Sequence, residues 1–179
     1  SEAETVLEEV KKLVERSREE DKEVDDESRE LVERVEEKLR RVLKKSKEDV
    51  DRVMRLIEEG KVREKVIEEV SRTSEKLLRD LEETVRRVVK RIEELNRESH
   101  ERNRRLEEDI RRLADELRKR GVLTEEVEDT IRRLIEENKK RNEESNRRNR
   151  ELIKKLERKL EEVKRRNEDL NRKLEETAR

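Results

Sequence analysis

The chain has 179 residues, of which 52 are Lys or Arg and 53 are Asp or Glu, so 59% of it is charged although the formal net charge is only -1. It contains no Cys, which excludes a disulfide framework and a thiolate zinc site, and no Phe, Trp or Tyr, which removes residues that favour strands. Its 45 Leu, Ile and Val residues exceed the roughly 20% below which chains tend to be disordered. These proportions predict an ordered, all-helical protein.

Membrane and export signals are also missing from the sequence. No apolar run approaches the roughly 18 residues of a membrane span, and no signal peptide opens the chain. We therefore expect a soluble protein without membrane association or a targeting signal, and the residues do not indicate a cellular location.

Two glycines divide the chain into three segments of similar length. Gly60 and Gly121 are the only glycines, and there is no proline. A glycine just past the end of a helix adopts the left-handed conformation that closes the last turn, and Glu, Lys, Arg and Leu are strong helix formers. The sequence predicts helices at about 2–59, 62–120 and 124–178.

The expected helix starts differ in their capping residues. Ser1 with Glu4 has the pattern of a capping box, and Thr124 before acidic residues has the pattern of an N-cap. The second helix, starting near Arg63, has no such residue.

One inward-facing stripe in each segment determines how the helices pair. In the first segment, eleven positions from Val10 to Ser46 follow helical spacing. Adding 121 to each number gives the equivalent position in the third segment, and subtracting each from 120 gives that in the second. A constant difference means parallel pairing and a constant sum means antiparallel pairing. The fold class predicted is all-α, an antiparallel up-down-up three-helix bundle that forms a single domain over residues 1–179.

The stripe also predicts the shape of the helices and two kinds of layer. Its ten steps cover 36 residues, a period of 3.6, so the coiled-coil-like helices should be long and nearly straight. Some layers are apolar in all three segments, such as Leu31 with Val89 and Leu152, whereas others align polar residues at one height. A buried polar group costs free energy unless it finds a partner, so the aligned layers predict hydrogen-bond networks across the helices. The predicted structural network consists of Ser17, Asp21, Ser28, Ser46, Ser74, Asn96, Ser99, His100, Asn103, Asn138, Asn142, Ser145, Asn149 and Asn167.

Ser99, His100 and Asp21 fall at one height and invite comparison with a nucleophilic triad. Ser99 and His100 are adjacent on a helix, however, and point about 100° apart, while the amides of an unbroken helix leave no oxyanion hole. One His and one Asp also fall short of the three or four ligands that zinc needs. The sequence therefore predicts no enzyme, no metal site and no cofactor.

A basic stretch at 139–150 precedes the leucines from Leu152 onward and superficially resembles the basic region of a leucine zipper. Glu143 and Glu144 interrupt it, acids balance bases over the whole chain, and no aromatic side chain can stack on a base. Glu162 with Arg166 exemplifies the i to i+4 pairs of a solvated helix face. We expect no nucleic-acid partner.

The aligned Ser, Asn and Asp layers, the Glu-rich and Arg-rich exterior and the turn at 121–126 resemble computationally designed helical bundles with buried hydrogen-bond networks. The likeness covers the whole chain, although the lack of aromatics and of a cap near Arg63 departs from that style. The resemblance implies a protein made to adopt a structure, with polar layers that specify helix pairing and no natural ligand.

Two functions are compatible with these features. The first is a monomeric structural scaffold without natural biochemical activity, which requires no partner. The alternative is a helical interaction module that self-associates or binds a partner helix, as a designed oligomer, heterodimer part or switch. The inward stripe is about three positions per heptad wide, which suits a helix that touches two others and leaves no second face to bury. The sequence thus favours the monomer.

Overall fold

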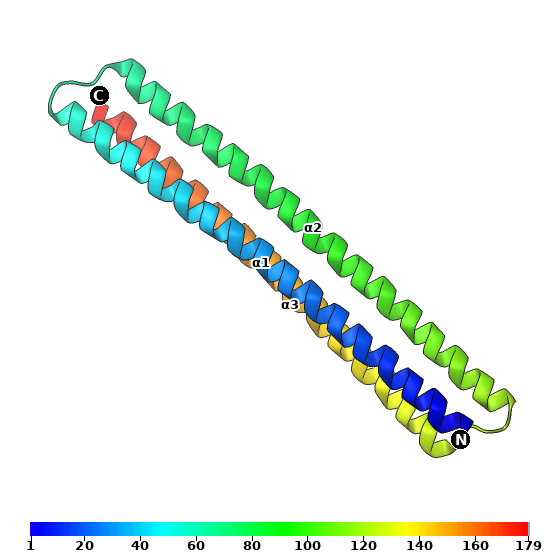
Figure 1. Cartoon of the computed structure of the whole chain (residues 1–179). Coiled ribbons are helices and arrows are strands. Elements are labelled where there is room, and N and C mark those ends of the chain that lie inside the picture. The colour runs from blue at the N-terminus through cyan, green and yellow to red at the C-terminus, as the bar shows by residue number, and fades with distance from the viewer. Residues whose placement is uncertain (179) are drawn as a thin grey trace. The chain divides into compact units, whose positions relative to one another are not determined.

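The computed structural model describes residues 1–178, which form three long helices labelled in Figure 1: α1 (Glu2–Glu58), α2 (Glu64–Lys119) and α3 (Glu125–Ala178). There is no strand within residues 1–178. None of the three helices in this range is both long and apolar enough to cross a bilayer. The predicted all-α class and the three-helix bundle are confirmed.

The glycines end the first two helices as expected. Gly60 has a φ of 69° and Gly121 a φ of 72°, both in the left-handed region. The Gly60 N–H donates to the Ile57 carbonyl at 3.0 Å, and the Lys61 N–H donates to the Leu56 carbonyl at 2.9 Å. These paired bonds form a Schellman motif, which satisfies carbonyls that the helix itself leaves open.

Side-chain caps define the starts of α1 and α3 but not of α2. Ser1 Oγ accepts from the N–H three residues further on at 3.3 Å, and Thr124 Oγ1 does the same at 3.2 Å. Residues 61–63 offer no capping oxygen, and α2 begins at Glu64, two residues later than expected. The uncapped first turn is the physical reason for this shift.

The helices contribute to two compact units, each with a length of all three. Unit 1 consists of Ser1–Arg29 and Arg91–Glu151, and unit 2 consists of Glu30–Lys90 and the chain from Leu152 onward. The single domain expected over the whole chain stays a prediction.

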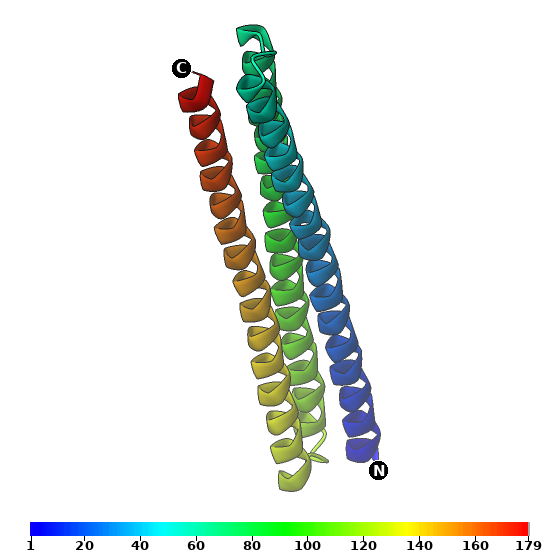
Figure 2. The ribbon, with the colours of Figure 1, turned by 90° about the vertical axis from the view of Figure 1, so that its left-hand side faces the viewer.

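In unit 1, α1 and α3 run parallel and α2 runs antiparallel to both. Asp21 bonds to Ser99 and to Asn142, and these pairs reproduce the sum of 120 and the difference of 121 expected from the sequence. The N-terminus lies at the same end of this unit as the α2–α3 connection (Figures 1 and 2). The core of this end contains Ala3, Val10, Val14, Ile110, Ala114, Leu117, Val127 and Ile131.

Unit 2 has the same up-down-up order. Ser46 contacts Ser74, whose numbers again sum to 120, and Ser74 bonds to Asn167. The C-terminal end of α3 lies at the same end as the α1–α2 connection (Figures 1 and 2). The predicted apolar layers of this unit include Val35 with Val85 and Leu156, and Leu39 with Leu81 and Leu160, and all six are buried.

One predicted apolar layer of unit 2 is displaced. Leu31, Val89 and Leu152 are only half-buried, whereas Val32 is 1% exposed and Ile153 is 8% exposed. The pair 32 and 153 also differs by 121, so the register is unchanged. Neighbouring apolar residues share the inward face of a helix, and a small rotation decides which of the two points to the centre.

Candidate functional site

The most complete polar layer of unit 1 joins all three of its helices. Ser99 Oγ on α2 donates to Asp21 Oδ1 on α1 at 3.0 Å, and Asn142 Nδ2 on α3 donates to the same oxygen at 3.0 Å. Asn142 Nδ2 also donates to Ser99 Oγ at 2.7 Å. All three residues are at most 5% exposed, so the layer is a closed triangle of buried hydrogen bonds.

The electrostatics of this layer centre on Asp21. Burial raises the pKa of its carboxyl above the ordinary value because the charged form loses water. Hydrogen bonds from Ser99 and Asn142 oppose this rise, the nearby Asp25 carboxylate adds to it, and Arg102 opposes it. Asp21 Oδ2 is buried and receives no hydrogen bond from the described residues.

A second polar chain lies one layer away. Asn138 Nδ2 donates to Asn103 Oδ1 at 2.5 Å, and the Arg141 guanidinium donates to Asn138 Oδ1 at 3.2 Å. Asn103 Nδ2 is buried without a hydrogen-bond acceptor among residues 1–178. Ser17, predicted to share this layer, is half-buried.

A third group contains a carboxylate that the inward stripe did not include. Ser145 Oγ donates to Asp25 Oδ1 at 2.5 Å, and the Arg148 guanidinium donates to Asp25 Oδ2 at 2.8 Å. Asp25 on α1 is thereby held by two residues of α3, and its side chain is 15% exposed.

The fourth polar group of unit 1 is built from amides. Asn149 Nδ2 donates to Asn96 Oδ1 at 2.9 Å, and Asn96 Nδ2 donates to the Asn146 backbone carbonyl at 3.2 Å. Ser28, at the same predicted height as Asn149, is fully buried, but its hydroxyl bonds to no described residue.

Unit 2 has one three-helix polar layer. Ser74 Oγ on α2 donates to Asn167 Oδ1 on α3 at 2.8 Å and lies 3.4 Å from Ser46 Oγ on α1. Because Ser74 uses its proton toward Asn167, Ser46 is the donor in the longer contact. The three side chains are 2–4% exposed.

Three ion pairs in unit 2 also join helices. Glu36 on α1 is 8% exposed and pairs with Lys155 and Lys159 on α3. Lys164 on α3 pairs with Glu82 on α2 at 3.1 Å, and this hydrogen bond raises the pKa of the lysine.

The sequence-based reasoning missed Asp25, Asn146 and Glu36 because it followed only the central stripe. The register gave no signal for the Glu36 pair. Adding 121 to 36 gives Glu157, which has the same charge as Glu36, and the partners Lys155 and Lys159 lie two residues away on either side. The ion pair depends on the reach of the lysine side chains.

His100 does not belong to the buried network, which corrects its assignment from the sequence. Its side chain is exposed, because it lies one residue beyond the inward-facing Ser99 and is rotated by about 100°. Ser99 Oγ instead donates a hydrogen bond to Asp21 and accepts one from Asn142. No group of three or more potential metal-binding side chains occurs in the described part of the chain.

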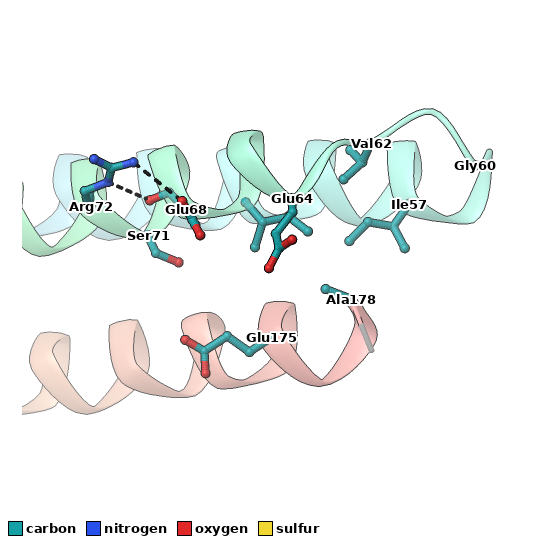
Figure 3. Close-up of a pocket in the computed structure, with 10 residues that line it drawn as sticks. Ile57, Gly60, Val62, Glu64, Glu68, Ser71, Arg72, Glu175 and Ala178 are labelled. Carbon is teal, nitrogen blue, oxygen red and sulfur yellow. Dashed lines mark hydrogen bonds and ion pairs between the residues drawn. The ribbon is translucent and has the colours of Figure 1, made fainter.

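A hollow of unit 2 lies at its end, beside the α1–α2 connection, with a volume of about 770 Å³. Figure 3 shows Ile57 and Val62 over one side and Ala178 opposite, with Glu64 and Glu175 projecting into the space between α2 and α3. Glu68 at its wall is paired with Arg72. The apolar side chains also pack on Val50, Val53 and Leu174, so the hollow is the open end of the core.

Two cations of the basic stretch at 139–150 are engaged within unit 1. Arg141 bonds to Asn138, and Arg148 bonds to Asp25. These cations are used in contacts between residues of the bundle itself.

Comparison with known proteins gives one informative likeness. The chain is similar to a solved structure described as "Computationally designed three helix bundle", with 18% sequence identity and a TM-score of 0.57. The match covers 98% of this chain and 87% of the other. At this identity the likeness shows the fold. No protein-family model and no curated protein matches the chain.

Proposed function

We propose that this chain is a designed structural scaffold whose buried polar layers specify how its helices pair. The observation that carries the proposal is the closed triangle of Asp21, Ser99 and Asn142, in which each helix of unit 1 supplies one member. In the Ser46, Ser74 and Asn167 layer of unit 2, each helix again supplies one member.

The physical role of such layers follows from the cost of misplacing them. A bundle built only from interchangeable Leu, Ile and Val layers can slide by one layer at little cost. A slipped register would instead set Asn and Ser against apolar side chains and leave buried polar groups without partners, at about 1–3 kcal/mol each. Polar layers therefore penalise wrong pairings more than they stabilise the right one.

The described similarity supports the design part of this proposal. The neighbouring structure is described as a computationally designed three-helix bundle, and this chain shares its fold. We assign no catalytic role, since the buried Ser99 hydroxyl is bonded to Asp21 and Asn142 and the histidine beside it is exposed.

Replacement of one polar layer tests the proposal. In the triple variant Ser46→Val, Ser74→Leu, Asn167→Leu, we expect unfolding at the same or a higher denaturant concentration. Well-packed apolar side chains often stabilise a core more than buried polar side chains do. Uniqueness should decrease, with mixed oligomers in light scattering and broadened amide spectra.

The matched control changes an apolar layer of the same unit, with Leu39→Ile, Leu81→Ile and Leu160→Ile. This volume-conserving variant should remain one species with sharp spectra. A polar-layer variant that is less stable, yet still a single species with sharp spectra, would show that the layer contributes stability and not specificity.

A further inference from the structure

Among the buried polar atoms of unit 1 that make no hydrogen bond with a described residue, two in adjacent layers have complementary chemistry. Asn103 is 9% exposed, and its Nδ2 donates to no acceptor among residues 1–178. Asp21 is 5% exposed, and its Oδ2 accepts from no donor in the same part of the chain. One group is a donor and the other an acceptor.

The orientation of the Asn103 amide follows from its neighbours. The Arg141 guanidinium can only donate, so it faces Asn138 Oδ1 and turns Asn138 Nδ2 toward Asn103. Asn103 therefore accepts this hydrogen bond with its Oδ1, at 2.5 Å from Asn138 Nδ2. The Asn103 NH₂ is thereby left to point elsewhere.

The Asp21 carboxylate is occupied on one side only. Oδ1 accepts from both Ser99 and Asn142, each at 3.0 Å. A carboxylate offers about four acceptor positions over its two oxygens, so Oδ2 retains its full capacity.

These groups lie in adjacent layers that a third polar side chain borders. Asn103 is four residues from Ser99 on α2, and Ser17 is four residues from Asp21 on α1, so each step is close to one helical turn and rises by about 6 Å. The numbers 17 and 103 sum to 120, which places both at one height. Ser17 is half-buried.

We propose that one water molecule binds between these two layers of unit 1. Its oxygen accepts from Asn103 Nδ2, one O–H donates to Asp21 Oδ2, and the other donates to Ser17 Oγ. Three hydrogen bonds are typical of a buried water, and the separation of one turn matches two consecutive hydrogen bonds.

The donor and acceptor pair selects this ligand over an ion. A metal cation would face the N–H protons of Asn103, and an anion would face the carboxylate of Asp21. Water both donates and accepts. Bound there, it joins the Arg141–Asn138–Asn103 chain to the Asp21–Ser99–Asn142 triangle as one network.

A crystal structure of the full chain that resolves ordered waters tests the site directly. The expected result is a water oxygen within hydrogen-bond distance of Asn103 Nδ2 and Asp21 Oδ2. In solution, rotating-frame NMR spectra should show a contact between water and the Asn103 side-chain amide protons. A direct hydrogen bond from Asn103 Nδ2 to Asp21 Oδ2, or a site without density, would overturn the proposal.

A pair of serine variants supplies the test in solution. Ser17→Ala removes one partner of the water, so the Asp21 carboxylate should lose stabilisation and its pKa, followed by carboxyl carbon shifts, should move further upward. Ser28→Ala is the matched control, because it makes the same change on α1 in the same unit at a hydroxyl that bonds to no described residue. Equal responses of the two variants would contradict the assignment of Ser17.

Discussion

Single residues in the polar layers differ in how completely their groups are satisfied. Asp21 is the extreme case in unit 1, since its carboxylate lies among buried side chains that are otherwise amide, hydroxyl and aliphatic. Its two hydrogen bonds on Oδ1 offset part of the desolvation cost, but burial is the larger effect and keeps the pKa of the carboxyl raised.

Removal of this carboxylate should destabilise the bundle. In Asp21→Ala, the Ser99 hydroxyl loses its acceptor and Asn142 loses one of two, so we expect a loss of about 1–3 kcal/mol in the free energy of unfolding. Denaturant titration followed by circular dichroism measures the change. The control Asp26→Ala, at an exposed position of the same helix, should lie within about 0.5 kcal/mol of the parent. An equal effect at both sites would mean that the triangle adds nothing to stability.

The raised pKa of Asp21 also predicts a pH dependence with a definite sign. Between the ordinary carboxyl value of 3.8 and the raised value, the folded chain binds more protons than the unfolded chain. The contribution of Asp21 to stability therefore increases as the pH falls through this window and decreases as the pH rises.

The measurement is the difference in free energy of unfolding between the parent and Asp21→Asn, whose side chain does not titrate. We expect the parent to gain relative to the variant on acidification from neutral pH, and the difference to level off below the ordinary value. A relative loss of the parent would mean that the hydrogen bonds of Asp21 outweigh its burial.

At the scale of the helices, the three elements are not equally well terminated. Ser1 and Thr124 satisfy N–H groups at the starts of α1 and α3, while α2 starts after Arg63 without a capping side chain. The start of α2 is thus the place where a local substitution can add stability without touching the core.

Introduction of a cap should stabilise α2. In Arg63→Ser, the hydroxyl can accept a backbone N–H of the first turn, and we expect a gain of about 0.5–2 kcal/mol in the free energy of unfolding. Arg63→Ala, which removes the same side chain without supplying an acceptor, is the control and should show little gain. Thermal and denaturant unfolding of the three proteins compares them, and equal stability of the Ser and Ala variants would exclude a capping effect.

The pairing of α1 with α3 has an electrostatic component in both units. Asp25 meets Arg148 in unit 1, and Glu36 meets Lys155 and Lys159 in unit 2. The two carboxylates are 15% and 10% exposed as side chains, so solvent screens these pairs less than the fully exposed i to i+4 pairs. The acid is on α1 and the base is on α3 in each case. This favours pairing of α1 with α3 over pairing of α1 with the α1 helix of a second copy, which would place acids opposite acids.

At the scale of the whole chain, little apolar surface is left for a partner. Among residues 1–178 the exposed large hydrophobics are Val66 in unit 2 and Val122 in unit 1, each 37% exposed. Isolated apolar residues of this kind are ordinary on a protein surface, whereas an interaction site presents a contiguous patch.

We therefore expect the chain to be a monomer that does not bind nucleic acid. Light scattering should give a mass of 22.0 kDa over a wide concentration range. On heparin the protein should elute below physiological salt, because acids are interspersed with the bases. A dimer mass would support the interaction module, and strong salt-sensitive retention would support a polyanion partner.

Much of the architecture was determined by the sequence alone. The two glycines predicted where the first two helices end. The stripe with period 3.6 and the constants 120 and 121 predicted the directions and register of the helices, because this pattern is repeated at every layer and does not depend on a single residue. The polar residues that align at one height, such as Asp21 with Ser99 and Asn142, could be grouped in the same way.

Only the tertiary structure decided which groups actually bond and which residues turn inward. Adjacent positions on a helix differ by 100°, so the rotation of each helix selected Val32 over Leu31 and left His100 in solvent. Side-chain reach brought Asp25 to Ser145 and Glu36 to Lys159, although none of the central stripe positions includes these carboxylates. A repeating pattern specifies spacing along the helices, whereas hydrogen bonds depend on rotations and side-chain directions that exist only once three helices pack together.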